Sequence, residues 1–280
     1  MSSNANLYVY HQQEIIPIQD AFLHISDLAV QRGYGVFDYF KTQRSSALFL
    51  DDYLQRFYES ARMMNLLVPL ATTELKNVLN QLMAKNQLAE SGIKIVLTGG
   101  YSADGYTIGE PNLIITQHAL PLPTAAQVQQ GIKIITHEYV RELPTAKTIN
   151  YSTGIRLQQQ LKTQGADDVL YHQNGVVSEF PRSNFFLVTA DERVLTPAQD
   201  VLKGITRKNV LELAGKKYQA AETTITLTDI AQAREAFTTS TTKRVLPVVQ
   251  IDGQPIGDGK PGPVTLALLQ DLISLENQQV

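Results

Sequence analysis

The spacing of apolar residues predicts helices in several parts of the chain. Leu54, Phe57, Tyr58, Ala61 and Met64 recur at three- and four-residue intervals, which is the repeat of one helix face. Similar patterns, with polar or glycine residues at their ends, predict further helices. We expect these at Thr72 or Thr73 to about Leu88, Ser152 to about Lys162, Thr206 to about Gly215, and Pro263 or Val264 to Leu275.

Short apolar runs between these helices predict strands, and Asn174-Gly175 between two of them is a strong signal for a hairpin turn. The expected strands are Leu7–Tyr10, Glu14–Ile16, Gly35–Lys41, Ala47–Leu50, Ile93–Thr98, Asn112–Thr116, Ile132–Ile135, Val169–His172, Val176–Ser178, Phe185–Val188, Val194–Leu195, Ala236–Thr239 and Val245–Val249. Many strands with interspersed helices favour an α/β (α+β) fold of two mixed domains over one wound parallel sheet.

The segment Ala119–Thr124 is the best candidate for a connection between domains. Its two prolines favour an extended backbone. We therefore expect an N-terminal domain over residues 1–118, a linker over 119–130 and a C-terminal domain over 131–280.

Composition narrows the range of functions. The chain has 280 residues, 43% hydrophobic and 18% charged, with a formal net charge of −3 and no cysteine. Its dispersed lysines and arginines form no basic stripe for nucleic acid, and no apolar run is long enough to cross a bilayer. The five histidines stand singly, so we expect no metal site. Met1–Asn6 lacks the features of a signal peptide, and we expect a cytoplasmic protein.

Three segments carry the chemistry of a pyridoxal-phosphate site. Lys147 precedes an expected helix, Glu179 follows the hairpin, and Gly204-Ile205-Thr206-Arg207 leads into another helix. Alone, each has an ordinary explanation as a solvated lysine, a hydrated glutamate or a capped helix. Together they supply an amine for the cofactor aldehyde, an acid for its ring nitrogen and a helix N-terminus for its phosphate.

Further residues near these segments fit the same cofactor, although each also has a structural reading. Tyr151 could reach the ring hydroxyl oxygen, and Leu202 could lie against the ring. Arg56 and the hydroxyl-rich Thr239–Thr242, with Thr241, could bind phosphate.

Several motifs in fixed order resemble those of the class IV aminotransferases, the fold type IV pyridoxal-phosphate enzymes, over nearly the whole chain. This family includes branched-chain aminotransferases, D-alanine aminotransferase and aminodeoxychorismate lyase. Phe180 replaces a glycine of the family pattern, and Tyr53 stands where histidine is usual. The motifs are Arg32–Asp38, Leu54–Phe57, Lys147-x-x-Asn150-Tyr151, Glu179-x-x-x-x-Asn184-x-Phe186, Leu202-x-Gly204–Arg207, and Ile251–Gly253 with Gly262-Pro263-x-Thr265.

The resemblance implies a small α/β N-terminal domain, a barrel-like C-terminal domain and a homodimer. It implies that Lys147 binds the cofactor covalently and moves the substrate proton, that Glu179 holds the pyridine nitrogen, and that Tyr151 holds the ring oxygen. The implied phosphate ligands are Arg56, Thr241 and the amides of Ile205 and Thr206. The implied reaction is a ping-pong exchange of an amino group between a branched-chain or D-amino acid and a 2-oxo acid.

The resemblance leaves the substrate open. D-alanine aminotransferase uses an arginine and a histidine to bind the substrate carboxylate, and Thr98–Tyr101 in the corresponding region supplies neither. The side chain and stereochemistry of the substrate therefore stay undetermined. Candidates for substrate binding are Tyr39, Thr242 and five cations, with Arg182 and Lys243 ranked first because they fall in motif loops: Arg32, Lys94, Arg182, Lys243 and Arg244.

Two other functions remain open from the sequence. One is a lyase on the same scaffold, eliminating pyruvate from aminodeoxychorismate, against which Tyr39 counts because the lyase has threonine there. The other is a binding protein that keeps the fold without turnover, against which the intact Lys147 and Glu179 count.

Overall fold

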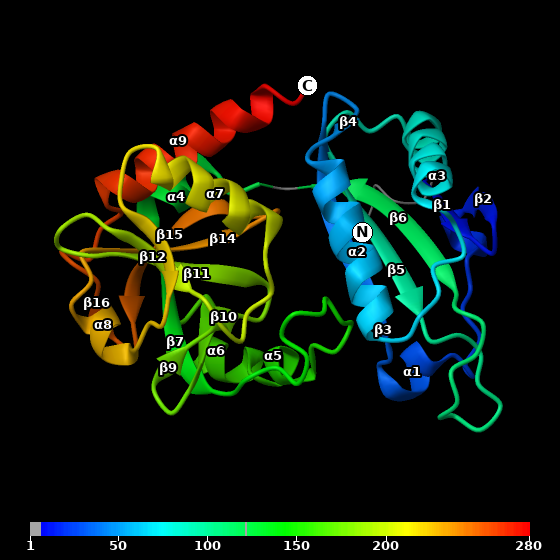
Figure 1. Ribbon diagram of the computed structural model, residues 1–280, viewed down its shortest axis with the longest axis horizontal. Helices are drawn as coiled ribbons and strands as arrows, with labels where there is room; N and C mark the ends of the chain where they lie inside the picture. The colour runs from blue at the N-terminus through cyan, green and yellow to red at the C-terminus, as the bar shows by residue number, and fades with distance from the viewer. Residues whose placement is uncertain (1–6, 121) are drawn as a thin grey trace. The chain divides into compact units, whose positions relative to one another are not determined.

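The structure is a computed structural model that describes residues 7–120 and 122–280. Met1–Asn6, considered above for a signal peptide, and Pro121 of the expected linker lie outside the described residues. The chain divides into two compact units (Figure 1). Among the described residues, unit 1 comprises 7–120, Ala146–Asn150 and Gln279–Val280, and unit 2 comprises 122–145 and Tyr151–Gln278. Lys147 therefore belongs to unit 1, although its segment follows the first strand of unit 2.

Unit 1 is built on a six-stranded sheet in the order β2-β1-β6-β5-β3-β4, with every neighbouring pair antiparallel. The strands are β1 (Tyr8–His11), β2 (Glu14–Pro17), β3 (Gly35–Gln43), β4 (Ser46–Ala47), β5 (Ser91–Thr98) and β6 (Leu113–Ala119). The helical elements are η1 (Ile18–Asp20), α1 (Leu28–Arg32), α2 (Leu50–Met63) and α3 (Thr72–Asn86).

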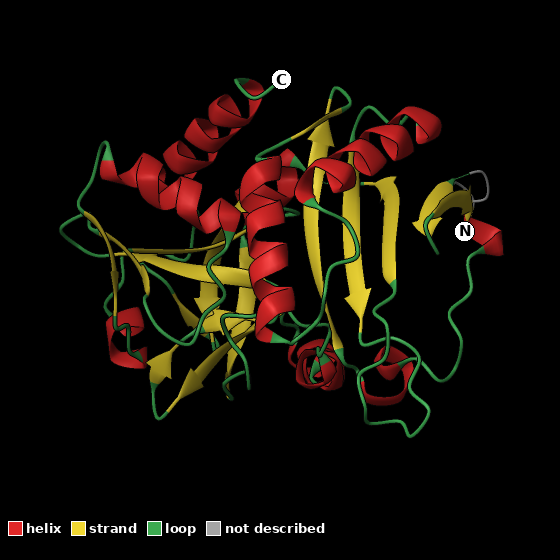
Figure 2. Ribbon diagram, turned by 45° about the vertical axis from the view of Figure 1, so that its right-hand side comes forward, coloured by secondary structure: helices red, strands yellow, loops and turns green. Residues whose placement is uncertain are grey.

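The core of unit 1 lies between one face of this sheet and α2 and α3, which form a layer beside the strands (Figures 1 and 2). The apolar stripe predicted for α2 supplies fully buried side chains, and alternate residues of the strands meet them. The side chains that are at most 1% exposed include Val36, Phe40, Leu54, Phe57, Leu75, Leu79, Ile93, Ile95, Leu97 and Ile115. The opposite face of the sheet carries half-buried side chains instead.

Unit 2 is built on a ten-stranded sheet that curls into a barrel-like form. Its main path is β13-β12-β11-β14-β15-β7-β8-β9, with β10 on β11 and β16 on β15. The strands are β7 (Ile132–Glu138), β8 (Asp168–Gln173), β9 (Val176–Val177), β10 (Glu179–Phe180), β11 (Ser183–Val188), β12 (Val194–Pro197), β13 (Ala220–Thr223), β14 (Glu235–Ser240), β15 (Arg244–Ile251) and β16 (Gln254–Pro255). The pairs β12–β13, β15–β7 and β7–β8 are parallel.

Alternation along β11 sorts side chains into two cores. Phe185 and Leu187 join one cluster with Ile134, Leu170 and Val248, whereas Phe186 and Val188 join another beneath α7 and α9. The helices of unit 2 are α4 (Ala125–Gln130), α5 (Ser152–Arg156), α6 (Gln158–Gln164), α7 (Ile205–Gly215), α8 (Leu227–Ala231) and α9 (Pro263–Asn277).

The mixed α/β class predicted from the sequence is confirmed, two local predictions are wrong, and three short α-helices were not predicted. The helix expected from Ser152 to about Lys162 is interrupted at Leu157, which ends α5 and precedes α6. The strand expected over Ala47–Leu50 ends at Ala47, because Phe49 takes a left-handed conformation and α2 starts at Leu50. The helices α1, α4 and α8 were not expected, since five or six residues show no clear helical repeat.

Candidate active site

The backbone around Lys147 is held against the edge of β3 in unit 1. The Phe37 N–H donates to the Lys147 carbonyl at 2.9 Å, and the Ile149 N–H donates to the Gly35 carbonyl at 3.1 Å. The Lys147 N–H donates to the Ser60 hydroxyl on α2 at 3.0 Å. These bonds fix the lysine backbone at both its amide and its carbonyl, so the point from which its side chain extends is set by the fold.

Two lysine ammonium groups lie at the ring of Phe37. The Nζ atom of Lys147 is 4.5 Å from the ring centroid, and that of Lys94 is 5.0 Å away. Attraction to the negative face of the ring stabilises each cation. Phe37 thus holds the expected Schiff-base lysine and a second cation within one small region of unit 1.

Tyr39 and His118 form a neutral pair on the same sheet. The Tyr39 hydroxyl is 3.3 Å from Nε2 of His118. Burial raises the pKa of Tyr39 to about 12. Burial, and then the charge of Lys94, lower the pKa of His118. Both groups are therefore uncharged near neutral pH, which leaves Lys94 as the charged neighbour.

Arg56 is held by a buried carboxylate of the neighbouring strand. Its Nε and Nη2 atoms donate to the two oxygens of Asp38 at 2.9 and 2.6 Å, and its guanidinium lies 5.3 Å from the Tyr53 ring centroid. The Asp38 side chain is fully buried and that of Arg56 is 10% exposed. The planar guanidinium is thus fixed in orientation, as a ligand for phosphate requires.

In unit 2, donors converge on the carboxylate of Glu179. Its Oε1 accepts from Nε of Arg141 at 2.8 Å, and its Oε2 accepts from the Leu202 N–H at 2.9 Å and from the Asn184 amide at 3.4 Å. Only donors contact this carboxylate in these bonds, which is the set that an ionised acid needs. Glu179 is 4% exposed, so its orientation is fixed by these partners.

The segment before α7 leaves room for an anion. Gly204 is the N-cap residue and carries no capping side chain, and within the described residues no acceptor bonds to the N–H groups of Ile205 or Thr206. A Cβ atom on Gly204 would lie 2.1 Å from Oδ1 of Asn184, so only glycine fits there. The Thr239 hydroxyl, opposite Asn184 on the next strand, is buried without a hydrogen-bond partner.

The other expected cofactor ligands of unit 2 lie on the loop before α7, in the turn after β14 and at the start of α5. The Leu202 carbonyl accepts from the Asn184 amide at 2.8 Å, which links the Glu179 carboxylate to the loop before α7. Thr241 is half-buried and Thr242 is exposed in the turn that follows β14, the strand of Thr239. Tyr151 is half-buried at the N-cap of α5. Glu179, Leu202, Gly204, Ile205 and Thr206 are thus brought together, and Thr241 follows β14, the strand that pairs with the strand of Asn184.

The five candidate cations have very different surroundings. Nζ of Lys243 lies 2.5 Å from Asp168, and Nε of Arg244 lies 2.8 Å from Glu276. Arg32 and Arg182 are exposed. Lys94 is half-buried, and no carboxylate contacts it in the part of the chain that the structure describes. The ranking of Lys243 and Arg182 from their positions in the sequence has no support in these contacts.

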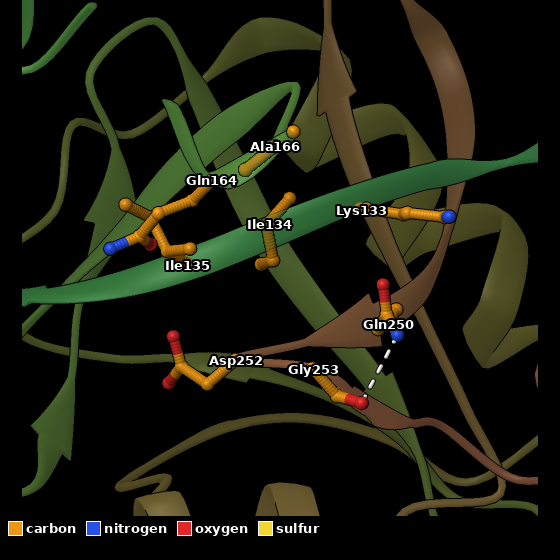
Figure 3. A pocket seen from close by; sticks show the side chains of 9 residues that line it. Lys133, Ile134, Ile135, Gln164, Ala166, Gln250, Asp252 and Gly253 are labelled. Carbon is orange, nitrogen blue, oxygen red and sulfur yellow. Dashed lines mark hydrogen bonds between the residues drawn. The ribbon is translucent and has the colours of Figure 1, made fainter. Parts of the chain in front are cut away.

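A pocket of about 380 Å³ lies elsewhere in unit 2, lined by β7, the end of β15 with the turn that follows it, and the end of α6 with the turn that follows it (Figure 3). The amide of Gln250 donates to the Gly253 carbonyl there at 3.1 Å. Both oxygens of Asp252 accept hydrogen bonds from Thr136. The side chains of Gln250 and Asp252 are therefore bound within the unit, and the lining of the pocket contains none of the candidate site residues.

Three polar residues that contact the candidate residues were missed in the sequence: Asp38 in unit 1, and in unit 2 Arg141 and Asn184, the latter as a link between Glu179 and Gly204. Asn184 and Asp38 stand in family motifs, which was the available signal. Arg141 lies 38 residues before its partner Glu179, and nothing in the sequence predicts that pair.

The residues present fit pyridoxal phosphate. The N–H groups of Ile205 and Thr206, the glycine required at position 204 and the buried, unpartnered Thr239 hydroxyl together suit an anion. Within the described residues, no group of three or more His, Cys, Asp or Glu side chains is arranged to hold a metal ion. None of the helices in that part of the chain is long and apolar enough to cross a membrane.

Comparison with known proteins agrees with this chemistry. Residues 35–251 match the model of the family described as amino-transferase class IV. D-alanine aminotransferase of Listeria monocytogenes serotype 4b is 30% identical over 265 residues, covering 91% of each chain. Branched-chain-amino-acid aminotransferase of Pseudomonas aeruginosa is 28% identical over 285 residues, covering 95% of this chain and 92% of its own.

A solved structure shows the same fold. The branched-chain amino acid aminotransferase of Escherichia coli superposes with a TM-score of 0.90 at 23% identity, covering 97% of this chain and 95% of its own. The fold type IV architecture inferred from the motifs is therefore confirmed.

The chain belongs to the class IV aminotransferase family, whose members are pyridoxal-phosphate enzymes. The activity expected from the sequence, transfer of an amino group, is confirmed at this level. These relatives do not favour the lyase or the non-catalytic alternative.

Proposed function

We propose that this enzyme binds pyridoxal phosphate through Lys147 and exchanges an amino group between a branched-chain or D-amino acid and a 2-oxo acid by a ping-pong mechanism. The observation that carries this proposal is the Glu179 carboxylate, buried and contacted by three donor groups. A carboxylate held in this way has a clear use opposite a protonated ring nitrogen and no evident use in packing.

The residues of each unit have separate tasks in this proposal. Bound pyridoxal phosphate supplies an aldehyde for the substrate amine and a ring that withdraws electrons from the substrate Cα. Nζ of Lys147 takes the proton from Cα and returns it at the other end of the exchange. Glu179 keeps the pyridine nitrogen protonated, and Arg141 keeps Glu179 in place.

Binding of the cofactor is divided among several groups. The N–H groups of Ile205 and Thr206, with Arg56 and Thr241, would bind the phosphate. Tyr151 would donate to the ring oxygen, and Leu202 would lie against the ring. The fixed backbone around Lys147 and the fixed side chain of Arg56 support this assignment, because prepositioned groups lose little entropy on binding.

The test is an absorbance spectrum of the purified protein, followed by separate titrations with L-leucine and D-alanine. A visible band of bound cofactor that one isomer bleaches supports transamination and identifies the stereochemical preference. The matched variants are Lys147→Ala, which should lose both the band and turnover, and Lys162→Ala on α6 of unit 2, which should keep them. The absence of a band after pyridoxal phosphate is added would contradict the proposal.

We also propose a homodimer and a cytoplasmic location, which follow from the resemblance and from the sequence. Exposed apolar side chains at one end of unit 1 support the dimer: Phe22, Ile25 and Tyr106 are 75, 74 and 85% exposed. They stand on two loops that are joined by a hydrogen bond from the Ser102 N–H to the Ser26 carbonyl, and exposed apolar side chains of this kind are typical of protein–protein contacts. Sedimentation equilibrium of the wild type and Phe22→Glu tests this, since a charge in the contact should shift the variant towards monomer.

A further inference from the structure

Among the five candidate cations for substrate binding, Lys94 of unit 1 has distinct surroundings. The other four candidate cations are paired with a carboxylate or exposed to solvent. Lys243 pairs with Asp168 and Arg244 with Glu276, whereas Arg32 and Arg182 are exposed. Lys94 is half-buried, no carboxylate contacts it within the described residues, and burial lowers its pKa. A buried ammonium without a counter-ion costs folding free energy, so a function for it has to be sought.

The register of the sheet places Lys94 on the same face as the candidate catalytic lysine. Tyr39 is opposite Lys94, and Phe37 is opposite Val96, so their side chains share one face. That face is the one not covered by α2, because Val36, Asp38 and Phe40 point to the other side. Phe37 contacts both ammonium groups, which brings Lys94 and Lys147 to one ring.

This arrangement matches the shape of an α-amino acid. Such a substrate carries its amine and its carboxylate on one carbon, so the group that binds the carboxylate must lie near the group that the amine displaces. Lys147 is the group displaced in the proposed reaction. Lys94 is the cation of the described chain that lies at the same ring without a carboxylate, and the positive charge on this face attracts anions.

We propose that Lys94 binds the α-carboxylate of the substrate, with the Tyr39 hydroxyl beside it as a neutral donor. The inference rests on the proposed transamination and adds the residue that selects amino acids over simple amines. Gly92 has a part in it: a Cβ atom there would lie 1.6 Å from the Tyr39 hydroxyl oxygen, so the absence of a side chain lets Tyr39 lie across β5.

The test compares wild type, Lys94→Met and Lys94→Arg in the cofactor-loaded protein. The amino acid that bleaches the band is titrated, and the half-saturating concentration is read separately from the limiting rate. Loss of a charged hydrogen bond should raise that concentration about 10- to 100-fold in Lys94→Met, whereas Lys94→Arg should stay within several-fold of wild type. The matched control is Lys85→Met, because Lys85 also lies over an aromatic ring of unit 1, at 4.2 Å from Tyr8.

Calorimetry supplies a second measurement that needs no turnover. Its probe is the carboxylic acid with the skeleton of the reacting amino acid, propionate for alanine or 4-methylvalerate for leucine, together with its primary amide. We expect Lys94→Met to bind the acid about 10- to 100-fold more weakly and the amide equally. The assignment would be overturned if Lys94→Met and the wild type bound the acid equally, or if the wild type did not bind the acid. The proposed function fails in a different way, by loss of the band in wild type.

Discussion

The two faces of the six-stranded sheet of unit 1 treat positive charge differently. On the face covered by α2, Arg56 shares two hydrogen bonds with the fully buried Asp38. On the other face, Lys94 contacts an aromatic ring and, in the described chain, no carboxylate. Asp38 and Tyr39 are adjacent in β3, so the alternation of a strand separates the two arrangements. On the covered face the positive charge has a carboxylate partner that fixes its orientation, whereas on the other face Lys94 has no carboxylate partner among the described residues.

The covered face should be the most sensitive to loss of a charge. Asp38→Asn leaves Arg56 buried with a neutral partner, and we expect a loss of about 3–5 kcal/mol in the free energy of unfolding. Urea unfolding of the cofactor-free protein measures it. Asp51→Asn is the control. Asp51 lies in α2, the helix of Arg56, and pairs with Lys76, but its side chain is 82% exposed, so less than about 1 kcal/mol of unfolding free energy should be lost. Equal losses would remove the distinction between buried and exposed pairs.

The open face should respond to added volume. Gly92→Ala brings a methyl group to the position now taken by the Tyr39 hydroxyl, and we expect a loss of about 1–3 kcal/mol. The same substitution in a Tyr39→Ala background should cost much less, because the contact is then absent. A double-mutant cycle from urea unfolding gives the difference. An equal cost in both backgrounds would show that Tyr39 does not occupy this space.

The ion pair of Glu222 with Arg207 in unit 2 should make the free energy of unfolding depend on pH. Hydrogen bonding by Arg207 lowers the pKa of Glu222 to about 2, against 4.5 for the unperturbed group. Stability from this pair is therefore fully present above pH 4.5 and is lost as the pH falls towards 2. The Glu222 side chain is 35% exposed, so we expect the pair to contribute only about 1–2 kcal/mol to the free energy of unfolding at pH 7. Unfolding of Glu222→Gln at pH 7 and pH 3 should show a difference at pH 3 that is about half or less of that at pH 7. An equal difference at both would contradict it.

The smallest effect is expected at Lys94, with the opposite sign. Burial lowers its pKa below 10.5, so its charge destabilises the folded state at neutral pH, and this cost disappears as the pH rises towards 10.5. Lys94→Met should leave the free energy of unfolding unchanged or raise it, by less than about 1 kcal/mol. Thermal unfolding at pH 7 measures it. A loss above about 2 kcal/mol would make Lys94 a structural residue.

Local elements were predictable where one stretch of chain carried the whole signal. The apolar stripe of α2 and the Asn174-Gly175 turn act over a few residues, and both are present. The helix α4 escaped prediction because it has no buried residue, so it lacks an apolar stripe. Its start is defined by a capping box at Thr124.

Candidate residues of the site could be named from the sequence, whereas the ion pairs around them could not. Motifs identified Lys147, Glu179 and the segment before α7. Sequence position alone ranked Lys243 with Arg182 first among the cations. The pairing of Lys243 with Asp168, 75 residues earlier, could not be foreseen, because it forms only when β8 and the turn before β15 meet in the folded sheet. Charge neutralisation of this kind depends on tertiary contacts, so Lys94 could be distinguished from the other cations only in the structure.

The most direct test asks which lysine at the Phe37 ring binds the cofactor. Borohydride reduction converts a carbon–nitrogen double bond between cofactor and lysine into a stable amine, which peptide mass mapping then locates. Our assignment predicts the label on Lys147 in both the wild type and Lys94→Met. Label on Lys94, or on any other lysine, would contradict the division of tasks between the two residues.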